Sequence, residues 1–279
     1  IHPHGKGRPM IVIEETRQGV PVLQADGILE AGGAAHGFST RLGGVSQGMW
    51  SSLNLGVSRG DNPEHVRENY RRFFTAIGVD GKKLVTTNQV HGGKVRVVTA
   101  ADWKEDPYEK VSYEADGLMT DTPGVVLLIF SADCIPVLLY DPVRRVAAAV
   151  HAGWRGTAAG IAATAVERMK EVYDCRPEDI LAAVGPGIGP CCFETHEDVP
   201  NAMMAAVSSA ALPYVKVLEN GKFSLDLKGI NARLLERAGL DASHIAVCQE
   251  CTACMAEKYW SHRRMGNNRG SMAAAIQLL

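Results

Sequence analysis

The chain has 279 residues, of which 46% are hydrophobic and 22% are charged, and this mixture excludes a disordered protein. It carries 29 Lys and Arg residues against 31 Asp and Glu residues, so it lacks the basic excess expected of a nucleic-acid-binding protein. The longest apolar run, Val125–Phe130, is far too short to span a membrane, and we therefore expect no membrane association.

No basic start is followed by an apolar stretch and a small-residue cleavage site, so the sequence does not predict export. The seven cysteines then favour reduced thiols in the cytoplasm over a disulfide scaffold. We expect residues 1–9 to be a leader or an added remnant and residues 10–279 to form a single domain. A monomer or a homodimer is expected.

Four segments carry helical signals. The clearest is the segment that follows Asn62, because Pro63 stands in the first turn, apolar residues recur at helical spacing, and Gly78 ends the pattern. The other helices are expected at Thr157–Tyr173, from near His196, and at Leu227–Ala238.

Short apolar runs predict strands, and several are apolar throughout, as expected for strands covered on both faces. They are Val95–Thr99, Val125–Ser131, Pro136–Tyr140, Val146–His151, Ile180–Val184 and Met272–Leu279. Strands and helices do not alternate strictly, so the order of elements indicates an α+β fold rather than a doubly wound sheet.

Three residues at strand ends or in glycine-containing turns are candidates for chemistry: His91, Cys134 and His151. Two imidazoles and one thiolate form a known catalytic zinc set, which leaves a fourth position for water. The same donors also suit copper. Because the three residues lie far apart in sequence and match no short zinc motif, spacing alone favours hydrogen-bonded, partly buried histidines and a core cysteine.

Two other interpretations use the same residues. Cys134 could be a nucleophile with His91 or His151 as its base, as in a cysteine hydrolase. Alternatively, a fourth protein ligand would close the coordination sphere and make the metal structural, in a binding module without enzyme activity.

Two further motifs are less specific. Gly153 and Gly156 precede a helix and, with Arg155, could hold an anion, although the glycines could equally serve only the turn. The C-x-x-C-x-x-C run of Cys248, Cys251 and Cys254 resembles a zinc knuckle or an iron–sulfur run, and Cys191-Cys192 could add ligands from a distance. We favour reduced structural thiols for this run.

Several ordered blocks together resemble one family over about residues 36–279. They are Gly37–Ser46, Ser52–Gly56, Gly60–Asn69, Asn88–Gly92, Ala115–Gly117, Ala132–Cys134, His151–Gly156, Gly185–Glu194 and Ser261–Arg264. With these blocks the chain resembles the YfiH and YlmD family, whose members are described as laccase-domain polyphenol oxidases and as purine nucleoside phosphorylases.

The resemblance implies a YfiH-like catalytic domain, with mixed β-sheets packed between helices, and a single metal bound by His91, Cys134 and His151. It implies a zinc enzyme that phosphorolyses adenosine, inosine, guanosine and methylthioadenosine and deaminates adenosine by hydrolysis, so purine nucleosides and phosphate are the expected partners. The alternative is a copper-dependent, laccase-like polyphenol oxidase at the same site. A full multicopper set is not expected, because the chain has nine histidines and two of them lie in the first four residues.

The implied chemistry suggests roles for further residues. Asp133 or Asp116 is a candidate proton carrier by position. Asn54 could bind the ribose or the base. The guanidinium groups expected to clamp phosphate belong to Arg41, Arg155 and Arg264.

The chain departs from the family pattern at two places. Asn268-Arg-Gly-Ser271 replaces the usual Thr-Gly-Arg run, and His196 replaces a small or apolar residue. No role is therefore assigned to Arg269 or His196.

Overall fold

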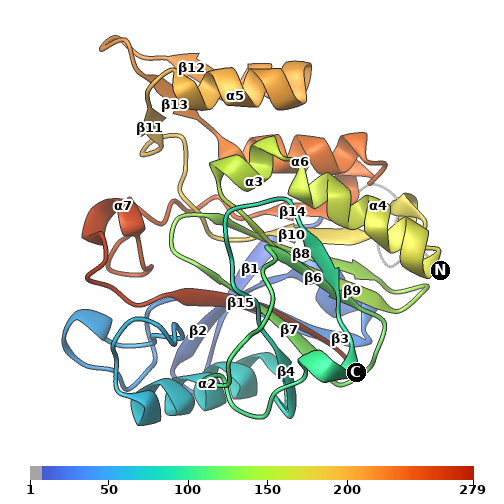
Figure 1. Ribbon diagram of the computed structural model, residues 1–279, viewed down its shortest axis with the longest axis vertical. Coiled ribbons are helices and arrows are strands. Elements are labelled where there is room, and N and C mark those ends of the chain that lie inside the picture. The colour runs from blue at the N-terminus through green and yellow to red at the C-terminus, as the bar shows by residue number, and fades with distance from the viewer. Residues whose placement is uncertain (1–7) are drawn as a thin grey trace.

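The computed structural model describes residues 8–279, so most of the expected leader, residues 1–7, lies outside the described residues. Two six-stranded mixed sheets form the centre of the molecule, and helices cover the outer face of each sheet (Figure 1). This α+β architecture is the predicted fold class. None of the helices in the described range is long and apolar enough to cross a membrane.

The first sheet has the order β1-β2-β3-β15-β7-β4. Its strands are β1 (Val12–Arg17), β2 (Val20–Ala25), β3 (Ala34–Ser39), β15 (Met272–Leu278), β7 (Val125–Ser131) and β4 (Lys83–Val85). The β4–β7 pair is parallel and the other pairs are antiparallel.

The second sheet has the order β14-β10-β8-β9-β6-β5, with parallel pairs at its two edges. Its strands are β14 (Ile245–Val247), β10 (Leu181–Val184), β8 (Ile135–Asp141), β9 (Val146–Ala152), β6 (Gly117–Thr120) and β5 (Val95–Val97). A small third sheet joins β11 (Glu194–Thr195), β13 (Phe223–Leu225) and β12 (Val215–Val217).

The helices segregate by sheet. Helix α2 (Pro63–Ile77) packs against the first sheet, and α3, α4 and α6 lie over the second (Figure 1). The remaining helical bounds are α1 (Asp26–Ala31), α3 (Trp154–Ala158), α4 (Ile161–Tyr173), α5 (Asp198–Val207), α6 (Leu227–Arg237) and α7 (His262–Met265).

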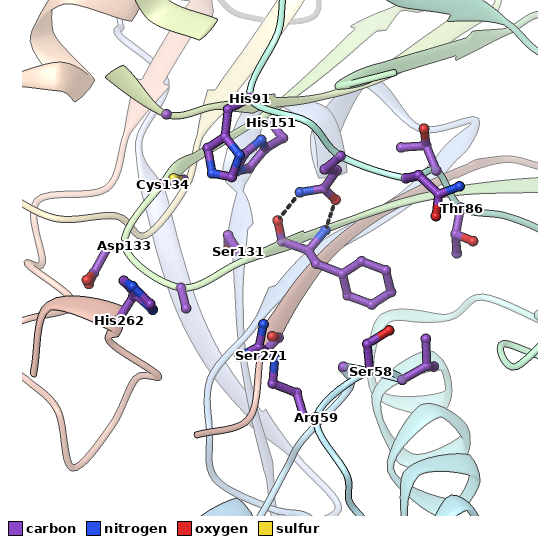
Figure 2. A pocket seen from close by; sticks show the side chains of 18 of the residues that line it. Ser58, Arg59, Thr86, His91, Ser131, Asp133, Cys134, His151, His262 and Ser271 are labelled. Atoms are coloured by element: carbon purple, nitrogen blue, oxygen red, sulfur yellow. Dashed lines mark hydrogen bonds between the residues drawn. The ribbon is translucent and has the colours of Figure 1, made fainter. Parts of the chain in front are cut away.

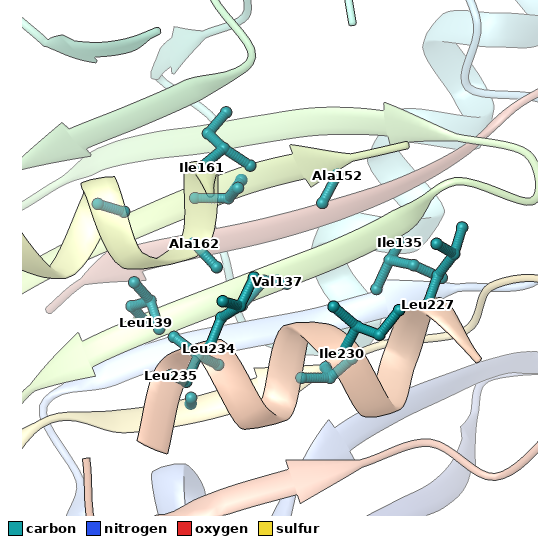
Figure 3. Close-up of a cluster of buried hydrophobic side chains, with 14 of the residues drawn as sticks. Ile135, Val137, Leu139, Ala152, Ile161, Ala162, Leu227, Ile230, Leu234 and Leu235 are labelled. Atoms are coloured by element: carbon teal, nitrogen blue, oxygen red, sulfur yellow. The ribbon is translucent and has the colours of Figure 1, made fainter. Parts of the chain in front are cut away.

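The apolar strands have two buried faces, as their sequences predict. On β8, Ile135, Val137 and Leu139 face the helices, while Leu138 and Tyr140 face the first sheet. Figure 3 shows side chains of α6 lying over the strand residues on the helix side. Full burial of each large aliphatic side chain contributes about 1.5–3 kcal/mol, so these two layers hold the sheets at fixed positions.

The prediction of one continuous helix at Thr157–Tyr173 is wrong, because two helices occupy this segment. Helix α3 ends at Ala158, and α4 begins at Ile161, because Gly160 between them adopts a left-handed conformation with φ of 71°. The α2 prediction is confirmed: the Asn62 side chain accepts a hydrogen bond from the Glu64 N–H, and Gly78 closes the helix in the left-handed region.

Buried His36 on β3 makes the stability of the fold depend on pH. Burial lowers its pKa to about 3, and its Nε2 accepts a hydrogen bond from the Ala25 N–H at 2.8 Å. In the unfolded chain His36 is protonated near its ordinary pKa of 6.5. The contribution of neutral His36 to the free energy of unfolding is therefore present above pH 6.5 and is lost as the pH falls toward 3.

We expect the free energy of unfolding to fall by about 2 kcal/mol between pH 6.5 and pH 5 because of His36. Urea unfolding at the two pH values measures this loss. His36→Gln keeps a hydrogen-bond acceptor and does not titrate. The free energy of unfolding of this variant should therefore fall by about 2 kcal/mol less than that of the unsubstituted protein over the same pH range. Identical pH slopes in the two proteins would contradict the assignment.

Candidate active site

The structure brings His91, Cys134 and His151 together. Each offers one ligand atom, and these three atoms lie within 4.8 Å of one another. The two imidazole rings are perpendicular, with centroids 5.0 Å apart (Figure 2). His91 follows β4 in a loop, Cys134 stands between β7 and β8, and His151 lies on β9. Sequence segments that are far apart therefore supply one compact donor set.

Asp116 positions two of these donors, His91 and His151, through hydrogen bonds. It is fully buried, and its carboxylate accepts hydrogen bonds from the backbone N–H groups of Val90, His91 and Gly92, each at 3.0 Å. A fourth contact, 2.8 Å long, joins Asp116 to Nδ1 of His151. This fourth contact directs Nε2 of His151 toward Cys134 and His91, and carboxylates commonly orient metal-binding histidines in this way.

The Cys134 thiol and the His151 ring stabilise each other in their charged forms. Burial opposes ionisation of the Cys134 thiol, but contacts with His151 and His91 outweigh it and lower the pKa to about 6. Burial likewise opposes protonation of His151, yet Asp116 and the Cys134 thiolate raise its pKa to about 9. The pocket thus pairs a Cys134 thiolate with a protonated His151. Zinc or copper would bind the thiolate and neutral imidazoles, so metal binding would release the His151 proton.

The loop that carries His91 is also held at Gln89, two residues before His91. Gln89 donates to the Phe130 carbonyl at 2.9 Å and accepts from the Phe130 N–H at 2.7 Å, which fastens the loop to β7. Gly153 lies against the same site: a Cβ atom there would stand 3.0 Å from Sγ of Cys134 and 3.2 Å from Cδ2 of His91. The glycine leaves room for the donors to meet.

Asp133 lines the pocket beside Cys134 but is fully engaged. Its carboxylate accepts hydrogen bonds from the Thr252 hydroxyl at 2.7 Å, the Ser261 hydroxyl at 3.0 Å and the Arg263 N–H at 2.6 Å. These contacts tie the Cys134 turn to the segment that leads into α7. Both predicted carboxylates therefore hold neighbouring groups in position.

The donor set opens into a pocket of about 870 Å³. Its aromatic lining includes Tyr108, Phe130, Trp154 and Phe193. Figure 2 shows Arg59 and Ser271 on the side of the pocket away from His91 and His151, and His262 beside Asp133. The volume and mixed lining are typical of a site for a small organic molecule.

Three arginines to which the sequence assigns no role line this pocket: Arg59, Arg263 and Arg269. The Arg263 guanidinium donates to the carbonyls of Cys192 and Glu194, which leaves Arg59 and Arg269. Arg269 is buried, donates to Nδ1 of His262 at 3.3 Å and contacts the Ser271 hydroxyl. Burial and the neighbouring Arg59 charge lower its pKa to about 10, so it remains cationic at neutral pH. Arg59 immediately precedes the family-like segment Gly60–Asn69, and Arg269 lies in Asn268–Ser271, where the chain departs from the family pattern. Their position beside these segments is the sequence signal that could have identified them.

The four residues expected to bind substrate or phosphate lie outside the pocket lining. The Arg41 guanidinium donates to the carbonyls of Ser51 and Ala256 and stacks on Trp260. Asn54 is fully buried and accepts hydrogen bonds from the N–H groups of Gly56 and Ser271, both of which line the pocket.

The other two arginines point elsewhere. Arg155 is exposed and stacks on Trp154. Arg264 donates to the Ala253 carbonyl at 3.0 Å and approaches Sγ of Cys192 at 3.8 Å. Strand-end patterns can locate the donors, but they do not reveal which arginines turn inward.

Asp116→Asn should weaken metal binding, because the amide cannot accept from three N–H groups and also polarise His151. We expect the zinc dissociation constant to rise about 10- to 100-fold, as measured by competition with a chromophoric chelator. Asp121→Asn, which changes an exposed carboxylate, is the matched control. Unchanged affinity in a folded Asp116→Asn protein would remove Asp116 from this role.

Comparison with known proteins agrees with this fold and shows the family of the chain. A family model described as multi-copper polyphenol oxidoreductase laccase matches residues 35–279. The chain is 39% identical over 263 residues to a purine nucleoside phosphorylase of Deinococcus radiodurans, covering 94% of this chain and 95% of that protein. It is 36% identical to the purine nucleoside phosphorylase YlmD of Geobacillus stearothermophilus, over 88% and 90% of the two chains.

The crystal structure of the hypothetical protein YfiH of Bacillus licheniformis is similar throughout. The TM-score is 0.88 at 32% identity, and the match covers 95% of this chain and 99% of that one. On the extent of these matches, the chain belongs to the laccase-like YfiH/YlmD family.

Proposed function

We propose that this protein is a zinc-dependent purine nucleoside phosphorylase that also deaminates adenosine by hydrolysis. One observation carries the proposal: the His91, Cys134 and His151 donors converge at one side of a pocket that also holds Arg59 and Arg269. A candidate metal-ligand set and two guanidinium groups thus share one cavity. The relatives named purine nucleoside phosphorylase support the same substrate class.

The pocket lining suits a purine nucleoside. Phe130, Trp154 and Phe193 offer flat apolar surfaces for a base. Polar groups such as Ser131 and Ser271 also line the pocket and would bind ribose hydroxyls. A pocket of about 870 Å³ accommodates a nucleoside together with phosphate.

Arg59 and Arg269 are our candidates for binding phosphate. Guanidinium groups bind phosphate through paired N–H donors, and the two charges lie close enough to lower the pKa of Arg269. In phosphorolysis a phosphate oxygen bonds to C1′ of the ribose while the bond from C1′ to the purine nitrogen breaks, and the purine leaves with a proton. The two arginines would hold the phosphate dianion against the positive charge that develops at C1′.

Zinc is the metal we propose for His91, Cys134 and His151. When bound, it would supply Lewis-acid chemistry and make hydroxide available near neutral pH, as hydrolytic deamination at C6 of adenine requires. Asp116 keeps His151 oriented, and Asp133 holds the Cys134 turn. We assign both carboxylates to positioning in preference to proton transfer, because their oxygens are occupied by other donors.

Copper-dependent phenol oxidation is the competing function. Two histidines and a cysteine can hold copper, and the description of the matching family model names a multi-copper polyphenol oxidoreductase. Of the histidines in residues 8–279, only His91, His151 and His262 line the pocket. This inventory supports one metal ion rather than a multicopper cluster, which favours nucleoside chemistry.

A cytoplasmic location fits this proposal. All seven cysteines are free in the described structure, and the cytoplasm keeps thiols reduced.

Purified protein incubated with adenosine, inosine, guanosine or methylthioadenosine tests the activity. With phosphate we expect the free base and the sugar 1-phosphate; without phosphate we expect adenosine to yield inosine. A chelator and Cys134→Ala should each abolish both conversions, whereas a thiol mechanism would survive the chelator. Conversion no greater than in Cys134→Ala, together with oxidation of a phenol by the copper-loaded protein, would replace this function with the competing one.

Substitution of the pocket arginines tests the phosphate assignment. Loss of a charge-assisted hydrogen bond costs about 1.5–3 kcal/mol, so Arg59→Met and Arg269→Met should each raise the KM for phosphate about 10- to 100-fold. Arg269→Lys should recover part of the loss. Arg233→Met, at an exposed residue paired with Glu236, is the control. If instead only Arg155→Met or Arg264→Met raised this KM, phosphate would bind outside the Arg59–Arg269 pair.

A further inference from the structure

Four cysteines form a second cluster outside the pocket. Cys191 and Cys192 precede β11, and Cys251 and Cys254 follow β14, yet their four Sγ atoms all lie within 4.8 Å of one another. The Sγ atom of Cys254 is 3.4 Å from that of Cys191 and 3.4 Å from that of Cys192. Cys248, the first cysteine of the C-x-x-C-x-x-C run, is instead buried in the core between the two sheets.

The spacing of these sulfur atoms identifies the kind of site. Four thiolates around one zinc ion, with Zn–S bonds of about 2.3 Å, have sulfur atoms about 3.8 Å apart. A disulfide requires about 2.05 Å, and the ligands of a four-iron cluster bind separate irons and are spread more widely. The observed separations therefore match a single tetrahedral ion with four sulfur ligands.

The surroundings of the cluster suit an anionic metal–thiolate group. The Gly189 N–H donates to Sγ of Cys251 at 3.1 Å. The Arg264 guanidinium lies 3.8 Å from Sγ of Cys192 and is held there by its bond to the Ala253 carbonyl. N–H donors and a nearby cation stabilise thiolates that carry excess negative charge.

The backbone also leaves room for the cluster. A Cβ atom at Gly189 would stand 3.2 Å from Cβ of Cys251 and 3.3 Å from Sγ of Cys191. Cys191 and Cys254 are exposed, so an ion can enter from solvent, whereas Cys251 is buried. The loop thus approaches the thiols closely on one side and leaves the other side open.

We propose that Cys191, Cys192, Cys251 and Cys254 bind one structural zinc ion, separate from the metal at His91, Cys134 and His151. Binding forms four Zn–S bonds and releases the protons of the thiols to solvent. Four protein ligands leave no position for water, so the site is structural rather than catalytic.

The zinc would join two segments that build the wall of the pocket. Ile188 and Phe193 flank the first cysteine pair and line the pocket. Thr252, next to Cys251, donates to Asp133, and Arg263 donates both to Asp133 and to the Cys192 carbonyl. A zinc ion that joins the two segments would therefore hold in place the hydrogen-bond donors to Asp133, which position the turn that carries Cys134.

Elemental analysis of the full chain, purified under reducing conditions, tests the proposal. The Cys134→Ala protein, which lacks the thiolate of the pocket site, should retain about one zinc per chain after reconstitution. Cys134→Ala combined with Cys254→Ser should retain almost none. Cys134→Ala combined with Cys248→Ala is the matched control, because it removes a neighbouring thiol outside the cluster, and it should keep the zinc.

Cobalt substitution gives a readout that requires no cluster variant. Cobalt added to zinc-free Cys134→Ala protein should show the sulfur-to-metal charge-transfer bands and intense tetrahedral d–d bands of a tetrathiolate. Removal of the zinc should also lower the Tm of Cys134→Ala, but not that of the Cys134→Ala/Cys254→Ser protein.

Three results of the metal analysis would overturn the proposal: no zinc or cobalt bound by reduced Cys134→Ala, zinc content unaffected by both Cys254→Ser and Cys191→Ser, or iron with acid-labile sulfide in place of zinc. Disulfides among these four cysteines in freshly purified protein would also overturn it.

Discussion

The buried carboxylate of Asp116 is the contact on which the site depends. Three consecutive N–H groups of the His91 loop and the ring of His151 converge on it, so one side chain sets the position of two metal-ligand candidates. A buried carboxylate without partners costs several kcal/mol, and the loop gains its fixed shape by meeting that need. Because of these four contacts, His91 in a loop is held in a fixed position, as His151 is on strand β9.

The pocket is assembled from segments that the two sheets hold at fixed positions. The loop after β4 brings His91, the turn between β7 and β8 brings Cys134, and β9 brings His151. Asn54, beneath the pocket lining, and Asp133, within it, bind the backbone N–H groups of Ser271 and Arg263. Because strands β7, β8 and β9 are buried on both faces, small shifts at the site would have to move a close-packed core.

The strands at Val125–Ser131 and Val146–His151 could be predicted because continuous burial leaves a long apolar run, and Met272–Leu279 departs from this pattern only at Gln277 and exposed Leu279. Strand β1 carries no such signal, because all six of its residues are exposed or half-buried and three of them are charged. The convergence of His91, Cys134 and His151 was expected from strand ends and from the family resemblance. The inward turn of Arg269 and the pairing of Cys191-Cys192 with Cys251 and Cys254 depend on long-range chain geometry, which local sequence patterns do not encode.

Strand β15 stands in the middle of the first sheet, between β3 and β7, although it follows every other strand of that sheet in the sequence. During synthesis the ribosome delivers both neighbours well before the strand that joins them. The nascent chain must therefore keep two open, apolar sheet edges apart until β15 emerges, and this interval is when chaperone binding or aggregation competes most strongly with folding.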